Sequence, residues 1–405
     1  MRRLAAMCSA LGTLVIVSAG PAPGAPAEGI RSKQWYLNAM RADEMWKHST
    51  GKGVEVAVVD SGVNPKTPSL KGQVLTGQVP KSVAYKATED GDGHGTGMAE
   101  LIAGTGAGGG VKGLAPGAKI LPLHIPYTTD RKDEDKLASL ADAIRAAADS
   151  DAKVINMSLT SPYSSSEEED AVKYAASKGK LMFAAIGNGG EKGKASYPAV
   201  YPYVVGVSAT DSTGTVGKFS TKSDYVDFAA PGVHIPLWCD GTFTRYCDTD
   251  GTSPATALAS ASAALVWSVH PDWTANQVLR TLLDTAGRSW PKDRPSTYLG
   301  YGLIRPRRVL MDQNIDPGPA DRDPLYAENG TDADEDVMAT PSLSVAPSPG
   351  RPAQDAGSSS GPGPAAAKDS GSGGDTATWV VIGAVAAVLV VAGAGFGVLR
   401  SRRNP

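Results

Sequence analysis

Short runs of apolar, largely β-branched residues recur along this chain and alternate with stretches whose apolar residues have helical spacing. Such runs suit strands of a parallel sheet, because those strands are covered on both faces. The runs are 54–59, 154–159, 181–186 and 204–208, and the helical stretches include 137–148 and 167–177. This alternation predicts an α/β domain over residues 53–312, with helices covering both faces of a mostly parallel sheet.

The first 27 residues have the pattern of a secretory signal peptide. Arg2 and Arg3 precede the apolar run 4–17, and small residues follow, with Ala19 and 25–27 as candidate cleavage points. The domain is therefore expected to be exported.

A second apolar run near the C-terminus predicts a membrane anchor. Residues 377–399 contain no charge and span roughly the 30 Å of a bilayer core. Arginines at 400, 402 and 403 are expected to keep the tail 400–405 in the cytoplasm. The alternative is a signal for a GPI anchor, which these arginines disfavour. The prediction is a single-pass type I protein of the cell membrane with its main domain outside the cell.

Two further segments flank the α/β domain. Residues 28–52 form an N-terminal extension that contains Trp35, Tyr36 and Trp46 and is too short to bury a core of its own. Residues 313–376 are rich in Pro, Gly, Ser and Asp, which predicts a disordered linker.

Cysteine usage agrees with export. Once a signal peptide containing Cys8 is removed, Cys239 and Cys247 remain, eight positions apart. In an oxidising compartment this pair is typical of one disulfide, with two free buried thiols as the alternative. The net charge of −3 gives no indication of a nucleic-acid partner.

Three short motifs supply a carboxylate, an imidazole and a hydroxyl. Asp60 ends the first strand, His94 begins a helical stretch, and Ser253 begins another, just before Pro254. A serine hydroxyl is a weak nucleophile, so a base must take its proton and an acid must orient that base. The positive end of a helix also favours the charge that develops when Ser253 attacks a carbonyl. The motifs predict a catalytic triad; the alternatives are a turn residue for Asp60 and a plain N-cap for Ser253.

The order of these motifs and their flanking residues resemble the subtilisin-like serine proteases. The matching segments are Val-Val-Asp60-Ser-Gly, Gly-His94-Gly-Thr-Gly and Asp-Gly-Thr-Ser253-Pro-Ala. The resemblance implies a subtilisin-like three-layer fold and a serine endopeptidase that cleaves proteins or peptides.

The same resemblance implies further site residues. Asn188, in Ala-Ala-Ile-Gly-Asn188-Gly-Gly, would donate to the oxyanion together with the backbone N–H of Ser253. Ser158, Leu159 and Thr160 would bind an extended substrate along a strand edge.

The short extension, the Pro-rich linker and the single C-terminal span resemble the mycosins, the membrane-anchored subtilases of actinobacterial type VII secretion systems. This implies a selective protease that cleaves few exported proteins and associates with that membrane complex. Two alternatives stay open: a mainly structural component of the complex, with proteolysis secondary, and a broad degradative protease of the cell surface.

No cofactor and no metal ligand set is predicted. The spacing typical of metal ligands is absent from the remaining histidines, His48, His124, His234 and His270. Scattered acidic residues leave structural calcium as an open alternative, but no ligand loop for it is recognisable. The glycine run 104–110 lacks the strand–turn–helix context of a nucleotide site.

Overall fold

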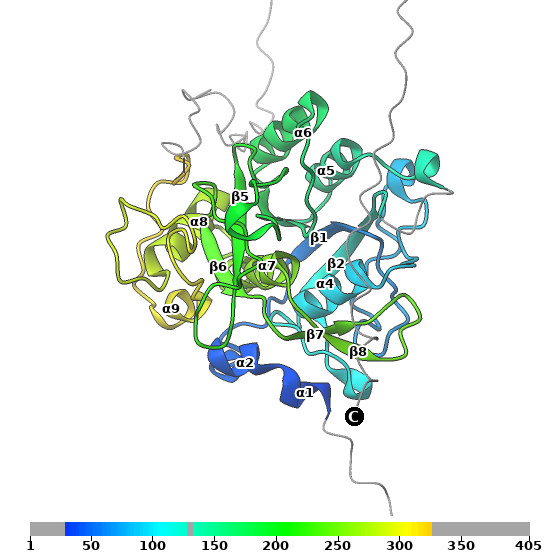
Figure 1. The fold of residues 1–405 in the computed structure, drawn as a ribbon, viewed down its shortest axis with the longest axis horizontal. Helices are drawn as coiled ribbons and strands as arrows, with labels where there is room; N and C mark the ends of the chain where they lie inside the picture. The colour runs from blue at the N-terminus through cyan, green and yellow to red at the C-terminus, as the bar shows by residue number, and fades with distance from the viewer. Residues whose placement is uncertain (1–28, 128–132, 326–405) are drawn as a thin grey trace, which may run out of the picture. The chain divides into compact units, whose positions relative to one another are not determined.

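The computed structural model describes residues 29–127 and 133–325 (Figure 1). Its centre is a parallel sheet with the strand order β2-β1-β3-β4-β5-β6. The strands are β1 (Glu55–Asp60), β2 (Lys119–His124), β3 (Val154–Met157), β4 (Leu181–Ala185), β5 (Val204–Thr210) and β6 (Phe228–Pro231). The strands predicted from the β-branched runs are thus confirmed as β1, β3, β4 and β5.

Side chains of the sheet alternate between two cores. In β1, Val56 and Val58 pack in one cluster with α4 (His94–Ala103), α7 (Thr252–Val269) and α8 (Ala275–Thr285). Ala57 and Val59 pack in the other with α5 (Leu140–Ala148) and α6 (Ser166–Ser177). Period-two alternation with both sides apolar is what a sheet covered on both faces requires. The predicted three-layer α/β fold is therefore confirmed (Figure 1).

Strands β2 and β6 were not predicted. Pro122 lies inside β2, and proline removes a ladder donor, so the run lacks the pattern of a buried strand. The structure places β2 at the edge of the sheet, where it pairs along β1. β6 is only four residues long, Phe-Ala-Ala-Pro, and also lies at an edge.

The N-terminal extension, from residue 29 onward, packs into the core of the domain. It forms the short helices α1 (Ile30–Lys33), α2 (Trp35–Ala39) and α3 (Ala42–Met45). Tyr36 and Met45 are fully buried, and Trp46 Nε1 donates to the carbonyl of Leu114 at 2.8 Å. These residues share one hydrophobic cluster with α4 and α7.

The predicted start of the linker at residue 313 is too early. After α9 (Pro306–Met311) the chain stays on the body as far as Leu325, whose side chain is buried. Thr274 Oγ1 donates to Ala320 O at 2.9 Å, and Gln277 Nε2 donates to Gly318 O at 3.0 Å. The buried side chain of Leu325 holds this segment on the domain. The surrounding residues are rich in Pro and Asp, so the composition alone does not indicate this contact.

Between residues 29 and 325, in the part that the structure describes, no helix is both long and apolar enough to cross a bilayer. The predicted signal peptide (1–27), membrane span (377–399) and basic tail (400–405) lie outside the described residues, as does most of the linker.

A small hairpin completes the described fold. It consists of β7 (Ile235–Trp238) and β8 (Tyr246–Thr249), which pair antiparallel. Cys239, directly after β7, and Cys247 in β8 form the predicted disulfide, which closes the loop that joins the two strands. Short 3₁₀ turns lie at Lys81–Val83, Ala107–Gly109, Glu134–Lys136 and Gly190–Lys192.

Candidate active site

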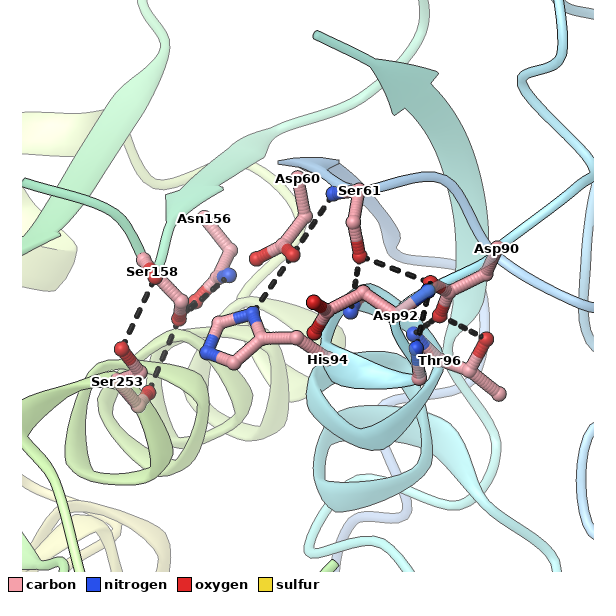
Figure 2. Close-up of polar contacts among 11 residues, drawn as sticks. Asp60, Ser61, Asp90, Asp92, His94, Thr96, Asn156, Ser158 and Ser253 are labelled. Atoms are coloured by element: carbon pink, nitrogen blue, oxygen red, sulfur yellow. Dashed lines mark hydrogen bonds and ion pairs between the residues drawn. The ribbon is translucent and has the colours of Figure 1, made fainter. Parts of the chain in front are cut away.

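Asp60 and His94 form a largely buried ion pair at the carboxyl edge of the sheet. Asp60 is the last residue of β1 and is fully buried, and His94 is the first residue of α4. His94 Nδ1 lies 2.7 Å from Asp60 Oδ1 (Figure 2). Burial lowers the pKa of His94, but the charge and hydrogen bond of Asp60 outweigh it, so the net pKa is raised. Asp60 therefore holds the ring in one orientation and stabilises its protonated form.

A second buried carboxylate, Asp90, shapes the loop that carries His94. Its Oδ1 accepts from Ser61 Oγ at 2.9 Å and from Gly93 N at 2.7 Å. Its Oδ2 accepts from Thr96 N at 2.8 Å and from Thr96 Oγ1 at 2.6 Å (Figure 2). Burial raises the pKa of Asp90 in spite of these bonds. Asp90 was not predicted from the sequence, although it lies four residues before His94.

Ser253 lies inside α7, not at its cap. The N-cap is Gly251, and Ser253 is the second helical residue, half-buried. Its Oγ donates to Ser158 O at 3.0 Å, and Ser158 Oγ donates to Ser253 O at 2.9 Å. Figure 2 shows the His94 ring between Asp60 and Ser253, with its second nitrogen directed toward Ser253. The structure thus excludes the N-cap alternative for Ser253. It pairs Asp60 with His94 and gives Ser253 Oγ a hydrogen bond to Ser158 O.

Asn188 is oriented by the start of α7. Its Oδ1 accepts from Thr252 N at 2.9 Å and from Thr252 Oγ1 at 3.0 Å. Because these two donors fix the oxygen, the amide NH₂ must point the other way. Asn188 and Ser253 line the same pocket, so the NH₂ group is available to an oxygen bound there.

That pocket, of about 560 Å³, contains all three predicted substrate-binding residues, Ser158, Leu159 and Thr160. This volume falls in the range of ordinary ligand pockets. Tyr127 also lines it and stacks on His94, with 5.2 Å between ring centroids. Tyr127 is a further residue of this pocket that was not predicted, since a single tyrosine after a strand carries no local signal in the sequence.

The disulfide hairpin borders the loop that precedes His94. A Cβ on Gly93 would lie 2.8 Å from the carbonyl of Asp240, and one on Gly241 would lie 2.2 Å from the carbonyl of Gly91. Gly93 also has a φ of +91°, so a side chain there would be both crowded and strained. The loop closed by Cys239 and Cys247 therefore packs directly on the His94 loop.

Glu100, two turns after His94 in α4, is a buried acid without a catalytic contact. Its Oε1 accepts from Thr67 Oγ1 at 2.8 Å and its Oε2 from Tyr246 Oη at 2.9 Å. Burial raises the pKa of Glu100 from 4.5 to about 7, and the hydrogen bonds oppose the shift only in part. Glu100 thereby joins the helix of His94 to strand β8 of the disulfide hairpin.

Residues 29–127 and 133–325 contain no group of three or more His, Cys, Asp or Glu side chains placed to hold a metal ion.

Residues 51–302 match the sequence profile of Peptidase_S8, the subtilase family. Minor extracellular protease Epr of Bacillus subtilis (strain 168) is 34% identical over 289 residues, which are 69% of this chain and 42% of that protein. The chain therefore spans less than half the length of Epr. Subtilisin Savinase of Lederbergia lenta is 34% identical over 257 residues, which are 63% of this chain and 92% of that protein.

Among solved structures, the fold is similar to that of MycP3 protease from the type VII (ESX-3) secretion system. The TM-score is 0.56 and the identity 31%, over 68% of this chain and 88% of that one. The family profile covers more than half of the chain and agrees with the fold and the motifs. This chain belongs to the subtilase family of serine endopeptidases.

Proposed function

We propose that this protein is a membrane-anchored extracellular serine endopeptidase with Asp60, His94 and Ser253 as its catalytic triad. The observation that carries the proposal is the buried pair of His94 and Asp60, 2.7 Å apart, beside a pocket that contains Ser253. A carboxylate that orients an imidazole, and an imidazole that takes the proton of a hydroxyl, are the parts that activate a serine nucleophile.

In the proposed reaction, Ser253 Oγ attacks the substrate carbonyl and His94 Nε2 takes its proton. Ser253 Oγ must first leave its hydrogen bond to Ser158 O, which is a rotation of one side chain. Catalytic hydrogen bonds are often loose in free enzymes and tighten when substrate binds. His94 then protonates the leaving amine, and water hydrolyses the acyl-enzyme by the reverse sequence of proton transfers. Asp60 stabilises the imidazolium formed in each step.

The developing oxyanion would be stabilised by Asn188 Nδ2 and by the backbone N–H of Ser253. The bonds from Thr252 to Asn188 Oδ1 support this role, because they hold the amide before substrate arrives. Preorganised donors cost no reorganisation during the reaction, which makes them effective in catalysis.

The location of the enzyme is part of the proposal. Residues 1–27 and 377–399 have the patterns of a signal peptide and a membrane span, which supports an anchored domain outside the cell. The likeness to MycP3 supports association with a type VII secretion system. Selective cleavage of a few exported proteins belongs to the same proposal.

A fluorophosphonate probe tests the proposed nucleophile. The full-length protein is expected to be labelled at one residue, and peptide mapping should identify it as Ser253. Ser253→Ala should abolish labelling, whereas Ser161→Ala, a neighbouring serine of the same pocket, should retain it. Labelling that persists in Ser253→Ala would contradict the assignment.

A second candidate function is a structural part of a secretion complex, with proteolysis secondary. It is favoured by the likeness to a protease that is itself part of a type VII system. Secretion that survives Ser253→Ala but fails when the gene is deleted would support the structural role. Loss of secretion in both strains would support proteolysis as the essential role.

A further inference from the structure

The pocket that contains Ser253 also contains one acidic side chain, Glu168. Among the described residues that line this pocket, every other side chain is uncharged. Ser158 and Asn188 lie in the same lining, so Glu168 shares the cavity with the groups proposed to bind the scissile bond. A substrate side chain adjacent to that bond would enter a cavity with negative charge in its wall.

Two contacts hold Glu168 in place. It lies in the first turn of α6, where its backbone N–H donates to the cap Ser165 Oγ at 3.4 Å. Its Oε2 accepts from Tyr201 Oη at 3.0 Å. The positive end of a helix favours a carboxylate in its first turn, so this position suits the ionised form.

Within the described part of the chain, no Lys, Arg or His forms an ion pair with Glu168. Its two neighbours differ: Glu169 pairs with Lys173 at 3.1 Å, and Glu167 is exposed and accepts from Ser165 Oγ. Glu168 is half-buried, and burial together with the charge of Glu167 raises its pKa. A bound cation would reverse that effect, because an opposite charge favours the ionised carboxylate.

We propose that Glu168 is a specificity-determining residue, which binds the Lys or Arg side chain of a substrate residue adjacent to the scissile bond. The inference rests on the proposed function, since it takes the pocket beside Ser253 as the substrate site. Lys and Arg carry a charge at the end of a long apolar stem, which suits a cavity with neutral walls and one carboxylate.

The expected size of the preference follows from the half-buried position of Glu168. Exposed ion pairs change binding by a few-fold at most, whereas fully desolvated pairs change it far more. A preference of about ten-fold in kcat/KM for Lys or Arg over Gln is therefore expected.

The test uses internally quenched peptides that carry Lys, Arg, Gln, Leu or Glu at each position around one cleavage site. The full-length protein cleaves them, mass spectrometry maps the cut bond, and kcat/KM is compared. Glu168→Gln keeps an acceptor for Tyr201 and should reduce the preference for Lys and Arg over Gln to about one. Glu168→Lys should instead disfavour basic peptides and favour Glu.

Glu167→Gln is the matched control, because that residue is adjacent, exposed and outside the pocket; it should keep the preference. The inference is overturned if no position next to the cut bond prefers Lys or Arg, or if Glu168→Gln retains the preference. Cleavage of Leu peptides by all variants would show that the proposed function holds even when the inference fails. If neither cleavage nor fluorophosphonate labelling occurs, the proposed function fails and the inference with it.

Discussion

Replacing Glu100 by Gln is expected to stabilise the protein at alkaline pH and not at acidic pH. Glu100 is fully buried, and its pKa is raised from 4.5 to about 7. The folded state therefore binds this proton more tightly than the unfolded chain does. Between those two pKa values unfolding releases a proton, so the contribution of Glu100 to stability falls as the pH rises.

The magnitude follows from the difference between 7 and 4.5, which is 2.5 pH units. At about 1.4 kcal/mol per unit, the ionised Glu100 costs about 3 kcal/mol of stability above pH 7. Gln avoids this cost because it carries no charge. It also keeps both contacts, since the hydroxyls of Thr67 and Tyr246 can each accept as well as donate.

The assay is urea unfolding of the full-length protein, followed by tryptophan fluorescence from pH 4.5 to 8.5. Both proteins carry Ser253→Ala so that self-cleavage does not interfere. The free energy of unfolding should differ little at the acidic end, and by about 3 kcal/mol in favour of Glu100→Gln at pH 8. Glu169→Gln, at a surface ion pair, should change stability by less than about 1 kcal/mol throughout.

The reasoning is refuted if Glu100→Gln differs from its parent by the same amount at pH 5 and at pH 8. A constant difference would mean that Glu100 does not change its protonation over this range. Its effect would then come from packing or hydrogen bonding alone.

Two further substitutions test the site. Asn188→Ala should lower kcat by about 10²–10³-fold with little change in KM, a magnitude taken from the oxyanion asparagine of subtilisin. Steady-state kinetics measure both constants, and a raised KM with an unchanged kcat would contradict the oxyanion role. Asp90→Asn should lower both stability and kcat. The amide NH₂ group that replaces one carboxylate oxygen would face hydrogen-bond donors in either orientation: those of Thr96, or those of Ser61 and Gly93. The cost is about 1–3 kcal/mol for each donor left unsatisfied, measured by urea unfolding, and full activity in this variant would show that the His94 loop does not need it.

Much of the sheet could be predicted from sequence because its central strands are covered on both faces. β1, β3, β4 and β5 each carry a run of apolar residues, which is a local signal. The edge strands β2 and β6 carry weaker signals, since an edge position tolerates proline and shorter pairing. Their existence depends on a neighbour to pair with, and pairing is not a local property of the sequence.

The pairing of Asp60 with His94 could be predicted because each lies in a short motif, one at the end of a strand and the other at the start of a helix. Asp60 and His94 are 34 positions apart, yet the carboxyl end of β1 and the first turn of α4 bring them within 2.7 Å. Asp90 and Glu100 were missed for the opposite reason. Their roles depend on which donors the folded chain places around them, and neither residue differs from a surface acid when read in the sequence.

The position of Glu168 in the pocket could not be predicted from the sequence. Glu168 lies in the run Ser-Glu-Glu-Glu-Asp, and each acidic residue of this run has the sequence pattern of an exposed residue at the end of a helix. Successive helical residues point about 100° apart, so only one of the three glutamates can face the strand edge at 158–161. Which one does so depends on how the cap at Ser165 and the contact with Tyr201 set the rotation of α6. The cap and the contact with Tyr201 therefore place Glu168, and neither Glu167 nor Glu169, in the lining of the pocket.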